Sequence, residues 1–159
     1  MRTIASLTAA VAILLAGTPT MAETPADLIR SFYEAVDDPE VPASALDRFF
    51  SRGFVDHDRP ATAPPDASDR DAALALFAAL EQGFPGSRHE IVHLAGIGPD
   101  TAMVHWAFEG RHDGQFFQYP ASGRDVAISG VDIFVVRDGR FAEQWHVEDL
   151  LSLFGQIGG

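Results

Sequence analysis

Two ionisable residues near the end of the chain, Asp132 and His146, stand in segments that are otherwise apolar. The apolar segment 125–136 is followed by an Asp-Gly pair at 138–139 and by a returning segment, 140–147. This pattern predicts a β-hairpin. A buried ionisable side chain is costly unless it has a partner. The two residues are therefore the first candidates for acid/base chemistry, in which one side chain orients or perturbs the other; a purely structural hydrogen-bonded pair is the alternative.

The turn decides whether Asp132 and His146 share a face of the sheet. A three-residue loop over 137–139, with its glycine left-handed, places Asp132 opposite Gln144 and makes His146 the diagonal neighbour on the same face. A two-residue turn places Asp132 opposite Trp145 and points His146 away. We favour the three-residue loop because it brings Asp132, Gln144 and His146 together.

Two other histidines stand where a pocket could form. His112 lies between two glycines in the stretch 110–114, directly after a predicted strand. Glycine allows close backbone approach, so His112 could overhang the mouth of a pocket. His57 lies between two carboxylates at a strand end, and these would favour its charged form. An exposed loop position is the alternative for both.

Three more histidines, His89, His93 and His105, lie on predicted strands and could gather on one sheet face. A metal needs three or four converging ligands, which strand alternation does not supply by itself. The chain also lacks a phosphate loop, a G-x-S-x-G elbow and a dinucleotide fingerprint. We therefore predict no metal, no cofactor and no nucleophilic serine or cysteine. The aromatic residues of this region form either plain core or the lining of an apolar pocket: Trp106, Phe108, Phe116, Phe117, Tyr119 and Trp145.

The predicted secondary structure follows a simple order, with helices first and strands afterwards. A helix starts at Thr24, a short one runs from Pro42 to Phe50 with Gly53 as its left-handed stop, and a third begins at Ser68. The strand patterns cover 91–97, 101–110, 125–136 and 140–147, with a brief extended piece at 54–57 and an apolar tail at 150–157. This order predicts an α+β domain, with about three N-terminal helices packed on one face of an antiparallel sheet.

The segment 125–136 is apolar at both alternating sets of positions. A strand with one solvated face would instead alternate apolar and polar residues. We therefore expect both faces of the sheet to be covered, one by helices and the other by an enclosed pocket around which the sheet curves.

The N-terminal segment 1–22 has the pattern of a secretory signal peptide, with Arg2, an apolar run over 4–16 and small residues around Ala22. An uncleaved anchor is the alternative. We expect a periplasmic or secreted protein that has no membrane contact after cleavage. The remaining residues, 23–159, have the size of one domain.

The formal net charge is −12, and lysine and cysteine are absent. No basic stripe exists to replace the counterions of a nucleic acid, and the same composition disfavours anionic membranes. Without cysteine, the domain must rely on packing and hydrogen bonds for its stability.

Several short motifs, taken in order, resemble the SnoaL-like polyketide (ester) cyclases. They are Asp56-His57, Phe84-Pro85, Gly110-x-His112-x-Gly114, Ser122-Gly123-Arg124, Asp132-Ile133, Arg137-x-Gly139-Arg140-x-x-Glu143-x-Trp145-x-x-x-Asp149 and Phe154-Gly155-Gln156-Ile157-Gly158. The resemblance covers nearly all of residues 23–159. It implies a cone-shaped α+β barrel of the nuclear-transport-factor-like superfold, which encloses an apolar pocket.

The resemblance also implies a chemistry, the cofactor-free aldol ring closure of polyketide esters by a carboxylate and a histidine. These two groups map best onto Asp132 and His146. The chain departs from the family pattern, because it has His146 where an acid is common and Gln144 where a histidine is common. The direction of proton transfer between the pair is therefore open.

From residues and resemblance together we expect an exported acid/base enzyme of the cyclase, isomerase or lyase type, acting on a small apolar carbonyl or ester compound. Asp132 and His146 are the expected catalytic residues. The expected substrate-binding residues are His57, His112, Gln144, Trp145, Asp149, Trp106 and Phe117. The alternatives are a non-catalytic carrier or sensor for a small hydrophobic ligand, and a dimeric structural module that uses the open sheet face. A homodimer is the expected assembly.

Overall fold

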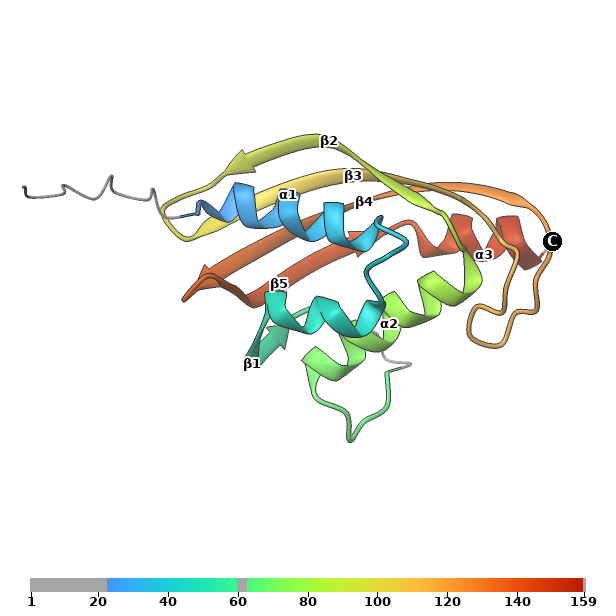
Figure 1. Cartoon of the computed structure of the whole chain (residues 1–159), viewed down its shortest axis with the longest axis horizontal. Helices are drawn as coiled ribbons and strands as arrows, with labels where there is room; N and C mark the ends of the chain where they lie inside the picture. Colours follow the sequence, from blue (N-terminus) through green and yellow to red (C-terminus); the bar gives the residue numbers. More distant parts are fainter. Residues whose placement is uncertain (1–22, 60–62, 159) are drawn as a thin grey trace, which may run out of the picture.

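The computed structural model describes residues 23–59 and 63–158 (Figure 1). The predicted signal segment, 1–22, lies outside the described residues. Within the described ranges, no helix is both long and apolar enough to cross a membrane.

The described residues form four helices: α1 (Pro25–Val36), the 3-10 helix η1 (Ala43–Phe49), α2 (Asp69–Gly83) and α3 (Leu150–Gly158). The first three match the predicted positions, and the segment predicted as an apolar tail forms the helix α3. Thr24 and Asp27 cap α1 reciprocally, and Ser68 caps α2, as their sequence patterns indicate. The expectation that Gly53 ends the second helix is wrong, because Gly53 lies inside strand β1 and has no positive φ.

The strands are β1 (Phe50–Asp56), β2 (Arg88–Gly96), β3 (Thr101–Arg111), β4 (Asp125–Arg137) and β5 (Arg140–Glu148). They form one sheet in the order β1-β5-β4-β3-β2. The pairs from β2 to β5 are antiparallel, as predicted, but β1 runs parallel to β5. No hairpin joins β1 to β5, so no tight turn forces an antiparallel pairing there. The sheet is therefore mixed.

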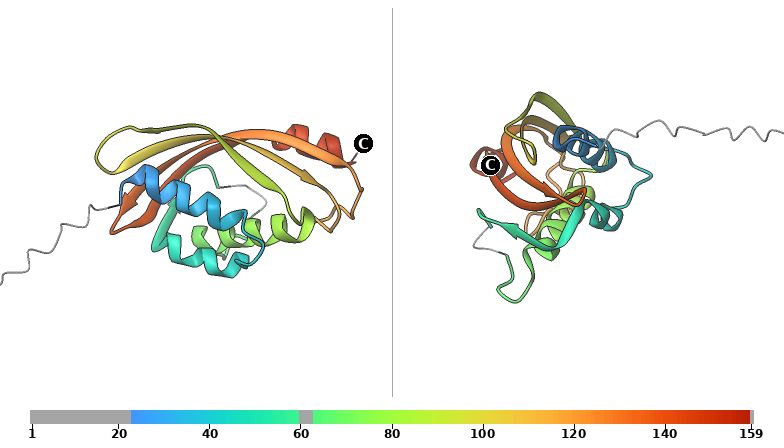
Figure 2. Two further views of the ribbon diagram at one scale, coloured as in Figure 1. Left: turned by 45° about the horizontal axis from the view of Figure 1, so that its top comes forward. Right: turned by 90° about the vertical axis from the view of Figure 1, so that its left-hand side faces the viewer.

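The sheet curves without closing into a barrel, and α1, η1 and α2 lie on its concave side (Figure 2). Along β3, the alternate residues Ala102, Val104, Trp106 and Phe108 are buried against these helices. Phe32 of α1 sits at the centre of the core and makes edge-to-face contacts with six other rings. The α+β class and the curved sheet are confirmed.

The expectation that both sheet faces are covered is wrong for the part of the chain that the structure describes. The helices and the cavity described below share the concave face. On the outer face, Val147 of β5 is 73% exposed and Val92 of β2 is 40% exposed. Apolar residues at both sets of positions in β4 therefore reflect a deeply buried inner row and a half-buried outer row.

The β4–β5 hairpin combines a two-residue turn with a β-bulge. Arg137 pairs with Arg140 across Asp138 and Gly139, which have φ values of 52° and 69°, as a type I′ turn requires. The bulge then makes Ala142 an extra residue, since Val136 pairs with Phe141 and Val135 with Glu143. The preferred three-residue loop is wrong. The two-residue alternative is incomplete, because the bulge shifts the register by one residue and sets Asp132 directly opposite His146.

Candidate functional site

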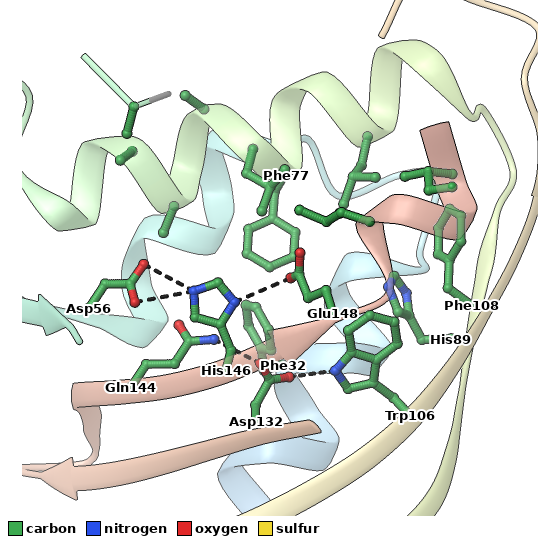
Figure 3. A pocket seen from close by; sticks show the side chains of 18 of the residues that line it. Phe32, Asp56, Phe77, His89, Trp106, Phe108, Asp132, Gln144, His146 and Glu148 are labelled. Carbon is green, nitrogen blue, oxygen red and sulfur yellow. Dashed lines mark hydrogen bonds and ion pairs between the residues drawn. The ribbon is translucent and has the colours of Figure 1, made fainter. Parts of the chain in front are cut away.

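A cavity of about 160 Å³ lies between the concave face of the sheet and the helices (Figure 3). Most of its lining is aromatic or aliphatic, from α1, α2, β3, β4 and the start of α3. A group of polar side chains interrupts this lining: Tyr33, Asp56, His89, Asp132, Gln144, His146 and Glu148. Convergent polar groups in an apolar pocket are typical of a ligand-binding or active site.

Asp132 is the deepest acid of the cavity, with an exposed fraction of 3%. Its Oδ2 accepts hydrogen bonds from the hydroxyl of Tyr33 and from Nε1 of Trp106, each at 2.6 Å. Its Oδ1 accepts a hydrogen bond from Nε2 of Gln144 at 2.9 Å. These donors come from α1, β3 and β5, so three separate elements fix the orientation of one carboxyl group.

Gly130 makes the contact between Trp106 and Asp132 possible. The indole of Trp106 covers Gly130, and a Cβ atom at position 130 would stand 2.2 Å from an indole carbon. Any larger residue would therefore displace the indole. The glycine has a packing role, since it leaves the space in which Trp106 reaches Asp132.

Burial raises the pKa of Asp132 above its ordinary value, and the nearby charge of Glu148 acts in the same direction. The hydrogen bonds from Tyr33, Trp106 and Gln144 oppose this shift because they favour the carboxylate. Burial, followed by the charge of Asp132, also raises the pKa of Tyr33 well above its ordinary value, so Tyr33 remains a neutral donor.

His146 lies between two carboxylates, Asp56 and Glu148 (Figure 3). Its Nε2 is 3.2 Å from Oδ1 of Asp56, and its Nδ1 is 3.5 Å from Oε1 of Glu148, an ion-pair distance outside hydrogen-bond geometry. These partners, Asp56 first, raise the pKa of His146 to about 10, against the opposing effect of burial. At neutral pH the ring is therefore an imidazolium.

The site thus places a fixed cation opposite a buried carboxylate on paired strands. Asp132 and His146 face each other in register, yet each is hydrogen-bonded to other residues. The expectation of a direct acid/imidazole pair is not what the described residues show. The arrangement can instead take up a proton at Asp132 and stabilise negative charge near His146.

Five of the nine predicted site residues line this cavity: Asp132, His146, Gln144, Trp106 and Phe117. Phe117 stands at the rim, where it is 51% exposed. The other four lie elsewhere. Asp149 accepts hydrogen bonds from the backbone and hydroxyl of Ser152, in the first turn of α3.

His57 and Trp145 lie on the outer side of the β1–β5 pair. Their rings stack at 4.0 Å, and Nε2 of His57 is 2.9 Å from Glu143. His112 is fully buried, its Nδ1 accepts a hydrogen bond from the backbone of Ser122, and it is absent from the cavity lining. The expectation that His112 overhangs a pocket mouth is therefore wrong.

Four polar lining residues were missed by sequence reasoning: Tyr33, Asp56, His89 and Glu148. Strand alternation could have identified Asp56 and Glu148, because the residue next to each of them points to the outer face of the sheet. The register β1–β5 pairs Asp56 with Gln144, so Asp56 rather than His57 faces inward. Tyr33 lay within the apolar stripe of the first helix, where it gave no separate signal.

The three strand histidines do not share a face, contrary to the grouping considered above. A β-bulge between Ile91 and His93 turns the strand, so His89 lines the cavity while His93 pairs with His105. Among the residues that the structure describes, no group of three or more His, Asp or Glu side chains is arranged to hold a metal ion.

Comparison with known proteins gives a consistent result. A family model described as SnoaL-like polyketide cyclase matches residues 27–157. Among solved structures, TsrD from Streptomyces laurentii is 25% identical with a TM-score of 0.68, covering 82% of this chain and 92% of that one. IdmH, a putative polyketide cyclase from Streptomyces antibioticus, is 25% identical with a TM-score of 0.67, covering 85% and 99%.

A putative SnoaL-like polyketide cyclase from Jannaschia sp. CCS1 has a TM-score of 0.69 at 21% identity, covering 90% of this chain and 99% of that one. At this identity the likeness concerns the fold alone. A search of the curated proteins found no match.

Proposed function

Because the chain belongs to the SnoaL-like polyketide cyclase family, we propose that it is a cofactor-independent acid/base enzyme acting on a small apolar carbonyl or ester compound. The observation that carries this proposal is the buried carboxyl of Asp132, which faces the imidazolium of His146 inside an apolar cavity. A carboxylate in such surroundings is a stronger base than one in water.

In the proposed reaction, Asp132 removes a proton from the carbon next to a carbonyl group. The C–H bond breaks, the proton goes to Asp132, and the electron pair moves onto the carbonyl oxygen as an enolate. A carboxylate has about four acceptor positions. Three are used by Tyr33, Trp106 and Gln144, which leaves about one, on Oδ1, for the substrate proton.

The charge of His146 would stabilise the enolate in a cavity whose lining is mostly apolar. Asp56 and Glu148 keep this charge in place across the neutral pH range. The enolate can then attack a second carbonyl of the same molecule, as in a cyclase, or be reprotonated at another carbon, as in an isomerase. Either outcome returns the proton from Asp132 and needs no external electron donor or acceptor.

The size of the cavity limits the substrate. An apolar cavity of about 150 Å³ holds a molecule of roughly one benzene ring. The cavity of about 160 Å³ therefore supports a substrate of single-ring size, smaller than a multi-ring polyketide.

The proposal is tested with Asp132→Asn on a panel of single-ring and open-chain carbonyl compounds. Loss of the base should lower kcat by about 100-fold or more. The urea midpoint should change little, because the side-chain amide of Gln144 can turn and present its oxygen to the new Asn. The matched control is Asp138→Asn in the hairpin turn, where asparagine tolerates the left-handed backbone.

Unchanged turnover in Asp132→Asn would refute the assignment of the base. Tight ligand binding without turnover of any compound by the wild type would instead favour the carrier. The carrier has one specific observation in its support, the three protein donors that already occupy Asp132.

A further inference from the structure

A second imidazole enters the cavity from strand β2, and the mechanism above does not use it. His89 lines the cavity between Trp106 and Phe108 (Figure 3). Asp37, just after α1, holds this residue at two points. Its Oδ2 accepts the backbone N–H of His89 at 2.7 Å, and its Oδ1 lies 2.8 Å from the ring atom Nδ1.

The contact with Asp37 determines which ring nitrogen of the neutral imidazole carries the proton. A carboxylate only accepts hydrogen bonds, so the proton of the neutral ring belongs on Nδ1. Nε2 of His89 is then an unprotonated acceptor. None of the described residues hydrogen-bonds to Nε2, and this atom is not sealed in the core. Because the side chain is only 6% exposed, the open space that Nε2 reaches is the cavity.

The surroundings of the ring hold it in one orientation. Its centroid lies 5.2 Å from the ring of Tyr33, 5.6 Å from that of Trp106 and 5.0 Å from that of Phe108. An acceptor that faces such aromatic walls is costly to leave without a donor. The hydrogen bond from the backbone N–H of His89 to Asp37 would by itself hold β2 against the end of α1. A purely structural role for this contact therefore does not explain why Nε2 of the ring reaches the cavity.

We propose that His89 is a binding subsite that accepts a hydrogen bond from a hydroxyl group of the ligand. The ligand class is a small ring or short chain with a phenol or enol hydroxyl. Tyr33 and Trp106 both touch the His89 ring and both donate to Asp132. A ligand of single-ring size would therefore meet His89 at one end and the Asp132 carboxyl at the other. The inference rests on the proposed function only in taking the same cavity as the ligand site.

The test compares phenol with toluene, which has nearly the same shape but no hydroxyl, in calorimetric or NMR titrations of the whole protein. The measured quantity is the ratio of the toluene Kd to the phenol Kd. Replacing the acceptor in His89→Leu should lower this ratio by roughly three- to tenfold, the worth of one hydrogen bond, with little change in toluene binding. His89→Gln retains an acceptor oxygen and should restore part of the ratio.

His93→Leu is the matched control, since His93 lies on the same strand and pairs with His105 outside the cavity. It should leave the ratio unchanged. An unchanged ratio in His89→Leu, or failure of both probes to bind the wild type, would overturn the inference. Asp132→Asn separates the two proposals, because it should lower kcat by about 100-fold, whereas adding His89→Leu to Asp132→Asn should still lower the ratio of the toluene Kd to the phenol Kd. Turnover that survives Asp132→Asn refutes the proposed function alone.

Discussion

Strand β5 carries a histidine–carboxylate cluster on each of its two faces. The inner cluster consists of His146, Asp56 and Glu148, and the outer cluster of His57, Glu143 and Trp145. Both are built across the same β1–β5 pair. In the inner cluster the side chain of His146 is 9% exposed and that of Asp56 also 9%. In the outer cluster the corresponding values for His57 and Glu143 are 35% and 23%.

The difference shows that surroundings, more than residue types, decide what a cluster can do. In the outer cluster, Glu143 is partly exposed to solvent and also pairs with Arg137. Hydrogen bonds from His57 and Arg137 lower the pKa of Glu143. In the inner cluster, two carboxylates in a low-dielectric cavity hold His146 charged. The outer cluster is therefore an ordinary surface ion pair, whereas the inner cluster combines the burial and the fixed charge that the proposed function requires.

The largest effect is expected when the two faces of β5 are exchanged. Inserting one alanine directly after Ala142, with the one-residue bulge retained, shifts the rest of β5 by one residue relative to β4, which would turn Glu143 and Trp145 inward and His146 outward. We expect a loss of more than about 4 kcal/mol in the free energy of unfolding, measured with urea. Ala142→Gly keeps the residue count and should cost about 1 kcal/mol. An insertion variant with wild-type stability and turnover would contradict the assigned role of this register.

Removing each imidazole in turn measures how much each cluster contributes to the free energy of unfolding. His146→Leu leaves the carboxylates of Asp56 and Glu148 in one cavity without a cation, which should cost about 2–4 kcal/mol of unfolding free energy. His57→Leu removes a surface partner and should cost less than about 1 kcal/mol. Urea denaturation at pH 7 checks both. Equal losses would show that burial does not distinguish the clusters.

The pH dependence of stability gives the smallest effect. The folded protein raises the pKa of His146 from 6.5 to about 10, so folding favours the protonated ring. The resulting stabilisation is complete below pH 6.5 and is lost as the pH rises toward 10. Between pH 7 and pH 8 the unfolding free energy should fall by up to about 1 kcal/mol. His146→Gln should flatten this slope; parallel curves for the two proteins would refute the assigned charge.

Much of the fold follows from local sequence signals. The caps at Thr24 and Ser68, the apolar spacing of α1 and the Asp-Gly turn all predict elements that the structure contains. The parallel β1–β5 pair and the bulge at Ala142 carry no such signal, because both result from pairing between distant segments or from backbone adjustment. The predicted signal peptide and homodimer stay predictions.

The candidate site was predictable only in part, for the same reason. Asp132 and His146 were identified because charged residues in apolar strands are unusual. Their partners Tyr33 and Asp56 come from elements that lie about 100 and 90 positions away in the chain. No local pattern brings such residues together; their meeting depends on the curvature of the sheet and the packing of α1.

The bulge at Ala142 lies near the turn of the β4–β5 hairpin, apart from the residues that line the cavity. The main chain there decides which side chains of β5 face inward, whatever those side chains are. A substitution at position 144, 146 or 148 consequently alters the chemistry offered to a ligand without sliding the strand. Single substitutions at these positions, whether natural or engineered, can therefore change the polar groups in the cavity while the backbone stays in the same register.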